Sequence, residues 1–215
     1  MQNYKTVAEE ATAEFTEKRS RFIAQVAPVK NEDEALAFLA AVRANHREAR
    51  HNVYAYICRE NNISRYSDDG EPSGTAGLPI MNVLTRQGLT DVCVVVTRYF
   101  GGILLGAGGL ARAYGKSAAD GILEAGVCEM VYSSLFSITV EYPLLAKIQH
   151  VLREKNFDIL DTVFLEKAVI TACTETERAE ELRALLVDTA NGNIEIEDGG
   201  AKYCARLLSE GDIEV

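Results

Sequence analysis

The sequence predicts an α+β protein with two domains, spanning residues 1–131 and 132–215. Apolar residues recur with strand-like and helix-like periods in a chain that is 47% hydrophobic and 25% charged, which is typical of a folded protein. Beyond residue 130 the predicted elements follow the order βαββαβ, which is the plan of ferredoxin-like domains. The charge balance also changes at this point, from 14 Lys+Arg against 16 Asp+Glu to 8 against 16.

The first domain begins with an alternating segment, residues 8–29, whose polar residues 17–20 predict the turn of a hairpin. Asn31 is a candidate N-cap with Glu34 three residues later, and this pair predicts a helix that continues to about residue 47. The remaining predicted elements are a strand at 52–58, a loop at 67–77, a helix at 78–87, a strand at 91–97 and a helix at 110–125.

The second domain is predicted to consist of short strands and two amphipathic helices. The predicted elements are a strand at 131–140, a helix at 144–155, strands at 157–165 and 168–174, a helix at 176–189 and a strand within 193–207. No Pro- or Ser-rich linker separates this domain from the first.

Composition excludes several classes of protein. No segment is apolar enough to span a bilayer and the N-terminus shows no signal peptide, so the sequence predicts a cytoplasmic protein with no membrane contact. The five cysteines match no metal-site spacing and predict buried, reduced thiols. The net charge of −10 resides mostly in the second domain, which should repel a phosphate backbone. Nucleic-acid contacts are therefore expected from basic residues of the first domain, at 18–21 and 43–65.

A glycine-rich segment, residues 98–116, connects a predicted strand to a predicted helix. Residues 106–111 match the dinucleotide pattern G-x-G-x-x-A, but residues 99–105 separate this pattern from the strand that it should follow directly. Residues 115–117 end like a P-loop, but Leu110 occupies the position of the first required glycine. The sequence therefore predicts neither dinucleotide nor ATP binding, and no cofactor is expected.

Two interpretations of this segment stay open. In the first, Gly108 and Gly109 lie at a helix N-terminus that binds an anion, and Arg98 and Arg112 add charge-assisted hydrogen bonds to phosphate or carboxylate. In the second, the glycines allow the segment to pack closely against the loop at 67–77.

That loop carries three acids, Asp68, Asp69 and Glu71, within four residues. Two carboxylates could hold a metal ion or perform acid–base chemistry, but acids are also ordinary residues of an Asp-Gly turn. Ser73 and Thr75 are more typical of turn and helix caps than of nucleophiles, because no histidine is near them in the sequence. The sequence therefore predicts no catalytic residue and no metal site.

Three segments carry a resemblance to a known family: residues 18–24 (KRSRFIA), 66–80 (YSDDGEPSGTAGLPI) and 96–114 (VTRYFGGILLGAGGLARAY). They resemble the signature of the YigZ/IMPACT family, whose bacterial members pair such an N-terminal domain with a small ferredoxin-like domain. The resemblance implies a ribosomal-protein-domain-2-like α+β domain, similar to domain IV of elongation factor G. The second domain is then similar to the last domain of that factor.

The family resemblance also bears on function. Eukaryotic IMPACT acts in translational control by binding a regulator of a stress kinase, through an action that involves an additional N-terminal domain. We therefore do not expect this chain to have the complete regulatory function of eukaryotic IMPACT. No activity of the bacterial members follows from the shared motifs.

These observations favour a non-enzymatic binding protein that contacts RNA or the translation machinery, such as the ribosome or a translation factor, through the first domain. The candidate binding residues are the cations and polar groups of the motifs and the glycines between them, namely Arg19, Arg21, Asp68, Asp69, Glu71, Ser73, Arg98, Tyr99, Gly101, Gly102, Gly106, Gly108, Gly109, Arg112 and Lys116. One alternative is an enzyme that acts on a small anionic substrate in a cleft between residues 67–80 and 98–116. Another is a protein partner bound by the acidic second domain.

Overall fold

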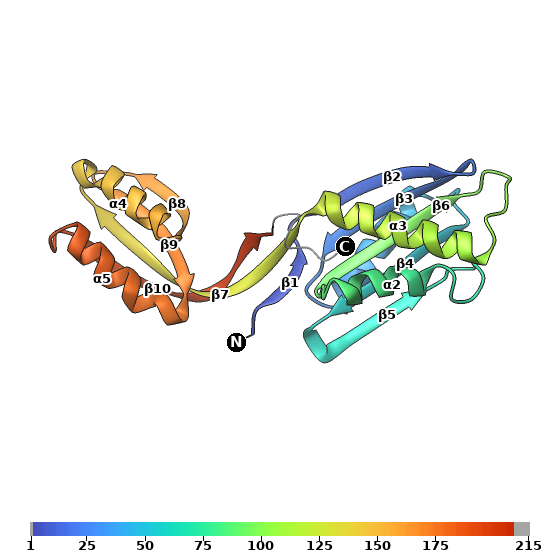
Figure 1. The fold of residues 1–215 in the computed structure, drawn as a ribbon, viewed down its shortest axis with the longest axis horizontal. Coiled ribbons are helices and arrows are strands. Elements are labelled where there is room, and N and C mark those ends of the chain that lie inside the picture. Colours follow the sequence, from blue (N-terminus) through green and yellow to red (C-terminus); the bar gives the residue numbers. More distant parts are fainter. Residues whose placement is uncertain (1, 209–215) are drawn as a thin grey trace. The chain divides into compact units, whose positions relative to one another are not determined.

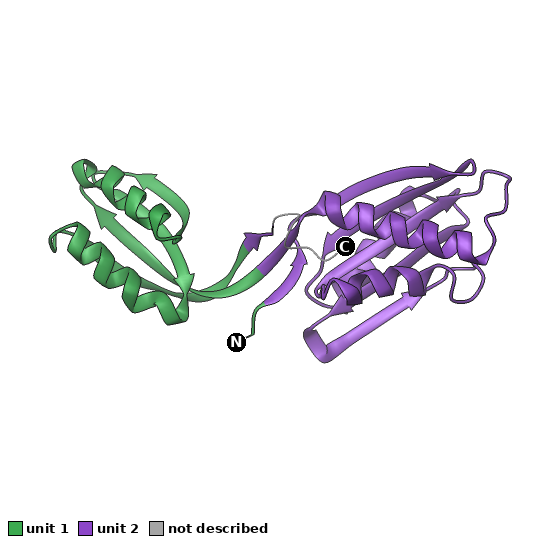
Figure 2. Cartoon of the chain, viewed as in Figure 1, with its two compact units in different colours: residues 1–3, 130–205 green, residues 4–129, 206–215 purple. Residues whose placement is uncertain are grey.

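The computed structural model describes residues 2–208, which form two compact units (Figure 2). The N-terminal unit contains residues 4–129 and the end of the described chain from residue 206, and the C-terminal unit contains residues 2–3 and 130–205. Both units combine helices with antiparallel strand pairs, which confirms the predicted α+β class.

The N-terminal unit contains a five-stranded sheet whose neighbouring strands are all antiparallel. Its strand order is β2 (Ala11–Glu17), β3 (Ser20–Pro28), β6 (Val92–Tyr99), β4 (His51–Cys58) and β5 (Ile63–Ser67). The central strand β6 is buried from Val92 to Arg98, because helices cover both faces of the sheet.

Helices α2 (Gly77–Arg86) and α3 (Ala107–Ala125) cover one face of this sheet (Figure 1). Helix α1 (Glu32–Asn45) packs against the other face, with Leu39 and Val42 in its core. Along α3 the residues Leu110, Tyr114, Ala118 and Ile122 recur every four positions, and this apolar stripe is buried in the larger core.

Local sequence signals determine where the helices begin and end. Asn31 caps α1 by accepting a hydrogen bond from the Glu34 backbone N–H, at 2.9 Å, as its spacing predicts. The Glu34 carboxylate accepts from the N–H of Lys30 at 2.8 Å, one residue earlier than in a standard capping box. Helix α3 begins at Ala107 rather than at the predicted residue 110, because Gly106, with φ +73°, turns the chain there.

Two strands of this unit were not predicted from the sequence. Strand β1 (Tyr4–Val7) is too short for its alternation to be informative. Strand β5 lies at the edge of the sheet and is exposed along most of its length, so it lacks the apolar pattern of a buried strand. A short 3₁₀ turn, Glu60–Asn62, joins it to β4.

The C-terminal unit has the predicted order βαββαβ. Its elements are β7 (Val127–Val140), α4 (Tyr142–Glu154), β8 (Asp158–Phe164), β9 (Ala168–Glu175), a 3₁₀ turn (Thr176–Arg178), α5 (Ala179–Thr189) and β10 (Glu195–Leu207). The strand order β10-β7-β9-β8 and two helices packed on a shared core give a ferredoxin-like domain. Strand β7 begins four residues before the predicted start, and β1 also pairs with it.

Four of the five cysteines are buried and unpaired, which confirms the prediction of buried thiols, while Cys204 is half-buried. Burial raises the pKa of Cys58 to about 11 and that of Cys93 to about 12. These two thiols are therefore poor nucleophiles at neutral pH.

Two glycines of α3 provide a matched test of packing. A Cβ at Gly121 would lie 2.9 Å from both Ala24 Cβ and Val26 Cγ2 of β3, whereas a Cβ at Gly115 meets nothing within 4 Å. We expect Gly121→Ala to lower the free energy of unfolding by about 1–3 kcal/mol through overpacking. Gly115→Ala should instead raise it by about 0.5–1 kcal/mol, because alanine favours the helix. Urea unfolding measures both variants. If both substitutions changed the free energy of unfolding in the same direction and by the same amount, this account of the packing would be wrong.

Candidate functional site

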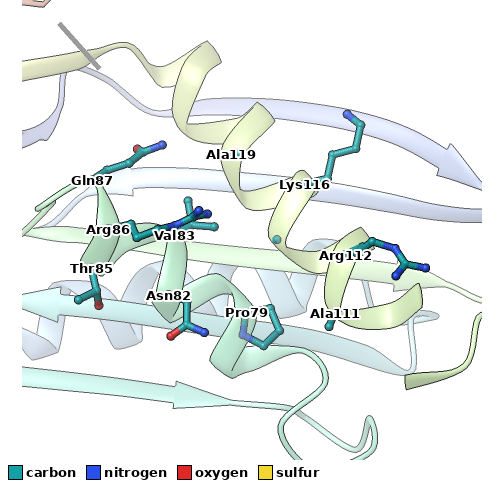
Figure 3. Close-up of a pocket in the computed structure, with 11 residues that line it drawn as sticks. Pro79, Asn82, Val83, Thr85, Arg86, Gln87, Ala111, Arg112, Lys116 and Ala119 are labelled. Atoms are coloured by element: carbon teal, nitrogen blue, oxygen red, sulfur yellow. The ribbon is translucent and has the colours of Figure 1, made fainter. Parts of the chain in front are cut away.

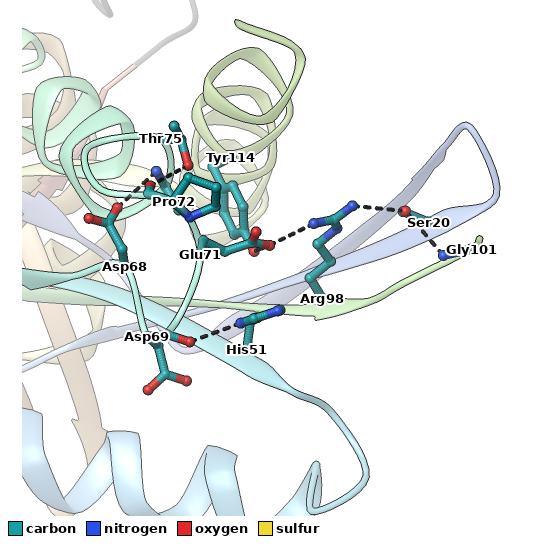
Figure 4. A network of polar contacts seen from close by, with 11 residues as sticks. Ser20, His51, Asp68, Asp69, Glu71, Pro72, Thr75, Arg98, Gly101 and Tyr114 are labelled. Atoms are coloured by element: carbon teal, nitrogen blue, oxygen red, sulfur yellow. Dashed lines mark hydrogen bonds and ion pairs between the residues drawn. The ribbon is translucent and has the colours of Figure 1, made fainter. Parts of the chain in front are cut away.

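A buried ion pair joins the two glycine-rich motifs of the N-terminal unit (Figure 4). The Arg98 guanidinium donates through Nη1 to Glu71 Oε1 at 2.7 Å, and the two side chains are only 6% and 4% exposed. The Tyr114 hydroxyl donates to the same carboxylate oxygen at 2.8 Å. The loop that carries Glu71 is therefore held between the end of β6 and helix α3.

The sheet register explains why this pair is buried. Arg98 lies directly between Phe22 of β3 and His51 of β4, so all three side chains share the face that α3 covers. The guanidinium lies 5.5 Å from the Phe22 ring centroid and 5.4 Å from that of Phe100. Burial, together with the Glu71 carboxylate, raises the pKa of Tyr114 well above its ordinary value, so its hydroxyl remains a donor.

The predicted loop at 67–77 is held by carboxylates that accept backbone N–H groups. Asp68 accepts hydrogen bonds from Gly74, Ala76 and Gly77 at 2.8–3.0 Å, at the start of α2. Asp69 accepts from the backbone N–H of Asn52 at 2.7 Å and from the Arg43 guanidinium at 2.8 Å. These acids diverge from one another, and no group of three or more potential metal ligands is found within residues 2–208.

His51 is oriented by the same loop. Its Nδ1 lies 2.9 Å from the carbonyl oxygen of Asp69, which can only accept, so Nδ1 carries a proton. Ser73 is exposed in this loop, and the Thr75 hydroxyl donates to the Pro72 carbonyl at 2.6 Å.

The glycines of the second motif have different structural reasons. A Cβ at Gly101 would lie 2.0 Å from the backbone of Arg19, so this glycine permits the β6 end to pack directly on the β2–β3 turn. Gly102 and Gly106 have φ of +82° and +73°, which glycine adopts without strain. A Cβ at Gly109 would lie 3.0 Å from Leu105 Cβ. A Cβ at Gly108 would meet only Nη1 of the exposed Arg112 side chain, at 3.7 Å.

The candidate cations are not gathered in one place. Arg98 is buried, while Arg21 pairs with Glu14 at 2.5 Å and lies over the Tyr99 ring, on the face of the sheet opposite to Arg98. The Tyr99 hydroxyl lies 2.9 Å from Nδ1 of His46, the residue that ends α1. Arg19, Arg112 and Lys116 are exposed, at the hairpin turn and on the outer side of α3. The structure thus separates one buried cation from a set that faces solvent.

A groove of about 950 Å³ lies between α2 and α3 (Figure 3). It is lined by Pro79, Asn82, Val83, Thr85, Arg86, Gln87, Ala111, Arg112, Gly115, Lys116 and Ala119. Gln87 Oε1 is buried there without a hydrogen-bond partner in the described chain. An adjoining hollow of about 200 Å³ shares Arg112 and Lys116 and includes Lys18 of the hairpin turn.

Sequence reasoning missed Arg86 and Gln87 as groove residues. They lie at the end of α2, and only the packing of α2 beside α3 places them in one groove with Arg112. Within residues 2–208, Arg86 and Arg112 form no ion pair, whereas Lys116 pairs with Asp120 one turn later and lies 4.7 Å from the Phe15 ring centroid. The available signal was the polar face of α2, where Asn82 and Arg86 are four residues apart.

The fold and these motifs define a class of protein: a two-unit α+β protein whose N-terminal unit presents a cationic groove and whose C-terminal unit is ferredoxin-like. Residues 18–122 match the model of the Impact N-terminal domain, and residues 138–193 match that of a domain of unknown function, DUF1949. The chain is 38% identical over 210 residues to the IMPACT family member YvyE of Bacillus subtilis, covering 97% of each protein. The chain belongs to the IMPACT family.

Other relatives support this membership. The chain is 32% identical over 182 residues to the IMPACT family member YigZ of Escherichia coli, covering 83% of this chain and 89% of that protein. It is 37% identical over 98 residues to Protein IMPACT of Mus musculus, and this match covers 43% of this chain and 30% of that protein. The fold is also similar to that of a solved structure titled as a hypothetical protein, with a TM-score of 0.58 and 30% sequence identity. The match covers 91% of this chain and 97% of the chain in that structure. No helix within residues 2–208 is long and apolar enough to cross a membrane.

The buried pair should contribute strongly to stability once one partner is removed. Glu71→Gln leaves the Arg98 charge buried without a counter-charge, so we expect a loss of about 3–5 kcal/mol in the free energy of unfolding. Glu14→Gln, which breaks the exposed pair with Arg21, should cost about 1 kcal/mol or less. Urea unfolding measures both. Similar losses in the two variants, or a Glu71→Gln/Arg98→Met variant no more stable than Glu71→Gln alone, would contradict this account.

Asp68 should make stability depend on pH in the acid range. Burial raises its pKa, but the hydrogen bonds from the Gly74, Gly77 and Ala76 N–H groups outweigh that effect and leave the pKa below its ordinary value. A group whose pKa is lower in the folded than in the unfolded protein stabilises the fold at pH values above its unfolded pKa, which is about 3.9 for Asp. This stabilisation disappears as the pH falls through the folded-state pKa.

Asp68→Asn is therefore expected to be less stable than the native protein at neutral pH, by about 1–3 kcal/mol. This difference should shrink as the pH is lowered below about 4. Urea unfolding measured at several pH values checks it. Glu48→Gln, at an exposed carboxylate without an ion pair in the described chain, is the control. A difference for Asp68→Asn that stays constant down to the lowest accessible pH would show that the hydrogen bonds do not depend on charge.

Proposed function

We propose that this protein binds RNA of the translation machinery through its N-terminal unit, as a binding protein rather than an enzyme. The observation that carries the proposal is the pair Arg86 and Arg112, which line the α2–α3 groove without an acidic partner in the described chain. Exposed cations in a protein of net charge −10 mark a local surface that attracts phosphate. The resemblance to eukaryotic IMPACT directs the choice of RNA towards translation.

The backbone supports the same surface. Helix α3 begins at Ala107, its N-cap residue Gly106 provides no side-chain cap, and its first turn has no acid, so the first N–H groups and the positive end of the helix dipole remain available to an anion. Gly108 leaves this turn open, because a Cβ there would meet only the Arg112 guanidinium. Arg112 and these N–H groups can therefore approach one phosphate together.

Two cations of the β2–β3 turn extend this surface. Lys18 lines the hollow that also contains Arg112, and Arg19 is exposed beside it. Both residues have positive φ, 45° and 65°, in a two-residue turn where Asn and Gly are usual. Such backbone strain at exposed basic residues is consistent with a functional reason for their presence.

The test is fluorescence anisotropy with a labelled single-stranded RNA 20-mer at several KCl concentrations. Arg86→Glu and Arg112→Glu should each weaken binding by about tenfold, since a charge-assisted hydrogen bond contributes about 1.5–3 kcal/mol. The salt dependence should also become less steep, by about 0.7 per lost phosphate contact on a log–log plot.

Lys30→Glu is the matched control, because this exposed cation lies outside both hollows and outside the basic segments at 18–21 and 43–65, and its substitution changes the net charge equally. If Lys30→Glu weakens binding as much as Arg112→Glu, or if binding does not depend on salt, the proposal is wrong.

A second candidate function is supported by Gln87 Oε1, which is buried in the groove without a hydrogen-bond partner in the described chain. A small anionic molecule held by Arg86 could donate a hydrogen bond to this oxygen. An enzyme acting on such a substrate would use the same groove. A thermal-shift screen with nucleotides and phosphorylated metabolites separates the two functions, because a ligand that binds only the folded protein raises its melting temperature.

A further inference from the structure

Strand β8 is an edge strand of the C-terminal sheet, at the end of the order β10-β7-β9-β8 (Figure 1). Among residues 2–208 it pairs only with β9. One row of backbone N–H and C=O groups along this seven-residue strand therefore faces away from the sheet. Such an edge is a template for the addition of another strand.

Exposed apolar side chains line this edge and the turn after it. Leu160 and Val163 are 44% and 43% exposed, and Phe164 and Leu165 are 64% and 65% exposed. Val163 lies opposite Val169 and Phe164 opposite Ala168 in the β8–β9 register, so the apolar groups project from both faces of the sheet. A strand added here would find apolar contacts on either side.

The inner side of β8 is fixed in place. The Tyr142 hydroxyl of α4 donates to the carbonyl oxygen of Leu165 at 2.6 Å, and Gln149 of α4 donates to the Thr162 hydroxyl at 3.3 Å. The edge is therefore held before any partner arrives, which reduces the entropy cost of binding.

The charge at this edge selects among partners. Asp161 and Glu166 are exposed there and form no ion pair within the described chain. The nearest cation in sequence, Lys167, lies 3.3 Å from Glu141 and 3.6 Å from Glu195, so its charge is already balanced. The edge is apolar and net negative, in a domain with 16 acidic and 8 basic residues.

We infer that β8 binds an extended segment of another protein in which apolar and basic residues alternate, and that this segment joins the five-stranded sheet as an additional edge strand. Main-chain hydrogen bonds would supply affinity, and the basic side chains would pair with Asp161 and Glu166. This site is independent of the groove in the N-terminal unit, so it can be tested separately.

Two other occupants are disfavoured by the same residues. Antiparallel pairing of two β8 strands centred on Asp161 would place two carboxylates directly opposite each other, which is destabilising. The bulge between Ile159 and Asp161 further interrupts a regular edge-to-edge register. RNA would be repelled by the acids.

The test uses the full chain and an acetylated nine-residue peptide of alternating Lys and Val, with amide shifts followed by NMR and affinity measured by fluorescence anisotropy. We expect saturable shifts confined mainly to residues 158–166. A Glu/Val peptide, and a Lys/Val peptide interrupted by two prolines, should bind at least about tenfold more weakly, because one reverses the charge and the other removes N–H donors. Asp161→Lys should reverse the preference between the Lys/Val and Glu/Val peptides.

Val163→Lys should weaken binding of the Lys/Val peptide by about tenfold, because it places a cation against the basic strand. Val187→Lys is the matched control, since Val187 on α5 has a similar exposure of 48%. Amide spectra verify that both variants fold. Equal binding by the two variants, shifts confined to the helices, or concentration-dependent self-association through β8 would each overturn the inference.

Discussion

The organisation of the N-terminal unit depends on the buried contact between Glu71 and Arg98. Transferring two charges from water into a protein interior is costly, and their attraction offsets this cost only when further hydrogen bonds satisfy the remaining atoms. Here Tyr114 donates to Glu71, and Arg98 Nη2 lies 3.3 Å from Ser20 Oγ, which also accepts from the N–H of Gly101 at 3.2 Å, whereas Arg98 Nε is buried without a partner in the described chain. The carboxylate thus fixes its loop, a strand end, a helix and a hairpin turn relative to one another within this unit.

This contact also determines which cations can bind a ligand. Because Glu71 neutralises Arg98 inside the unit, the most evident cation of the glycine-rich motif contributes little to the external potential. In the proposed function, the attraction for phosphate would come instead from Arg86, Arg112 and the basic turn at 18–19, which lie outside the core. Their effect is local, since the whole chain has a net charge of −10 and would otherwise be repelled by nucleic acid. If the protein binds RNA as proposed, a local cationic surface on an acidic protein would restrict that RNA to one orientation.

The sequence was sufficient for the parts of the fold that local interactions determine. Asn31 predicted the start of α1 because a cap is formed by neighbouring residues, and the stripe from Leu110 to Ile122 predicted the buried side of α3. The edge strand β5 was missed because an exposed strand needs no apolar period. Whether Arg98 is buried could not be predicted, since its partner Glu71 is 27 residues away in sequence. The contribution of Arg86 likewise depends on how two helices pack.

The question of whether the glycines serve packing or binding has a different answer at different positions. Gly101 is required by a backbone contact with Arg19, and Gly106 by the turn that starts α3. Neither reason applies to Gly108, whose helical position would accept alanine sterically and with a gain in helix propensity. Gly108 lies beside an arginine without an ion pair in the described chain and at an uncapped helix start, so in the proposed function it would let an anion approach the backbone. Within the motif, Gly101 and Gly106 therefore have structural reasons, whereas Gly108 and Arg112 are the positions at which the proposed anion binding is to be tested.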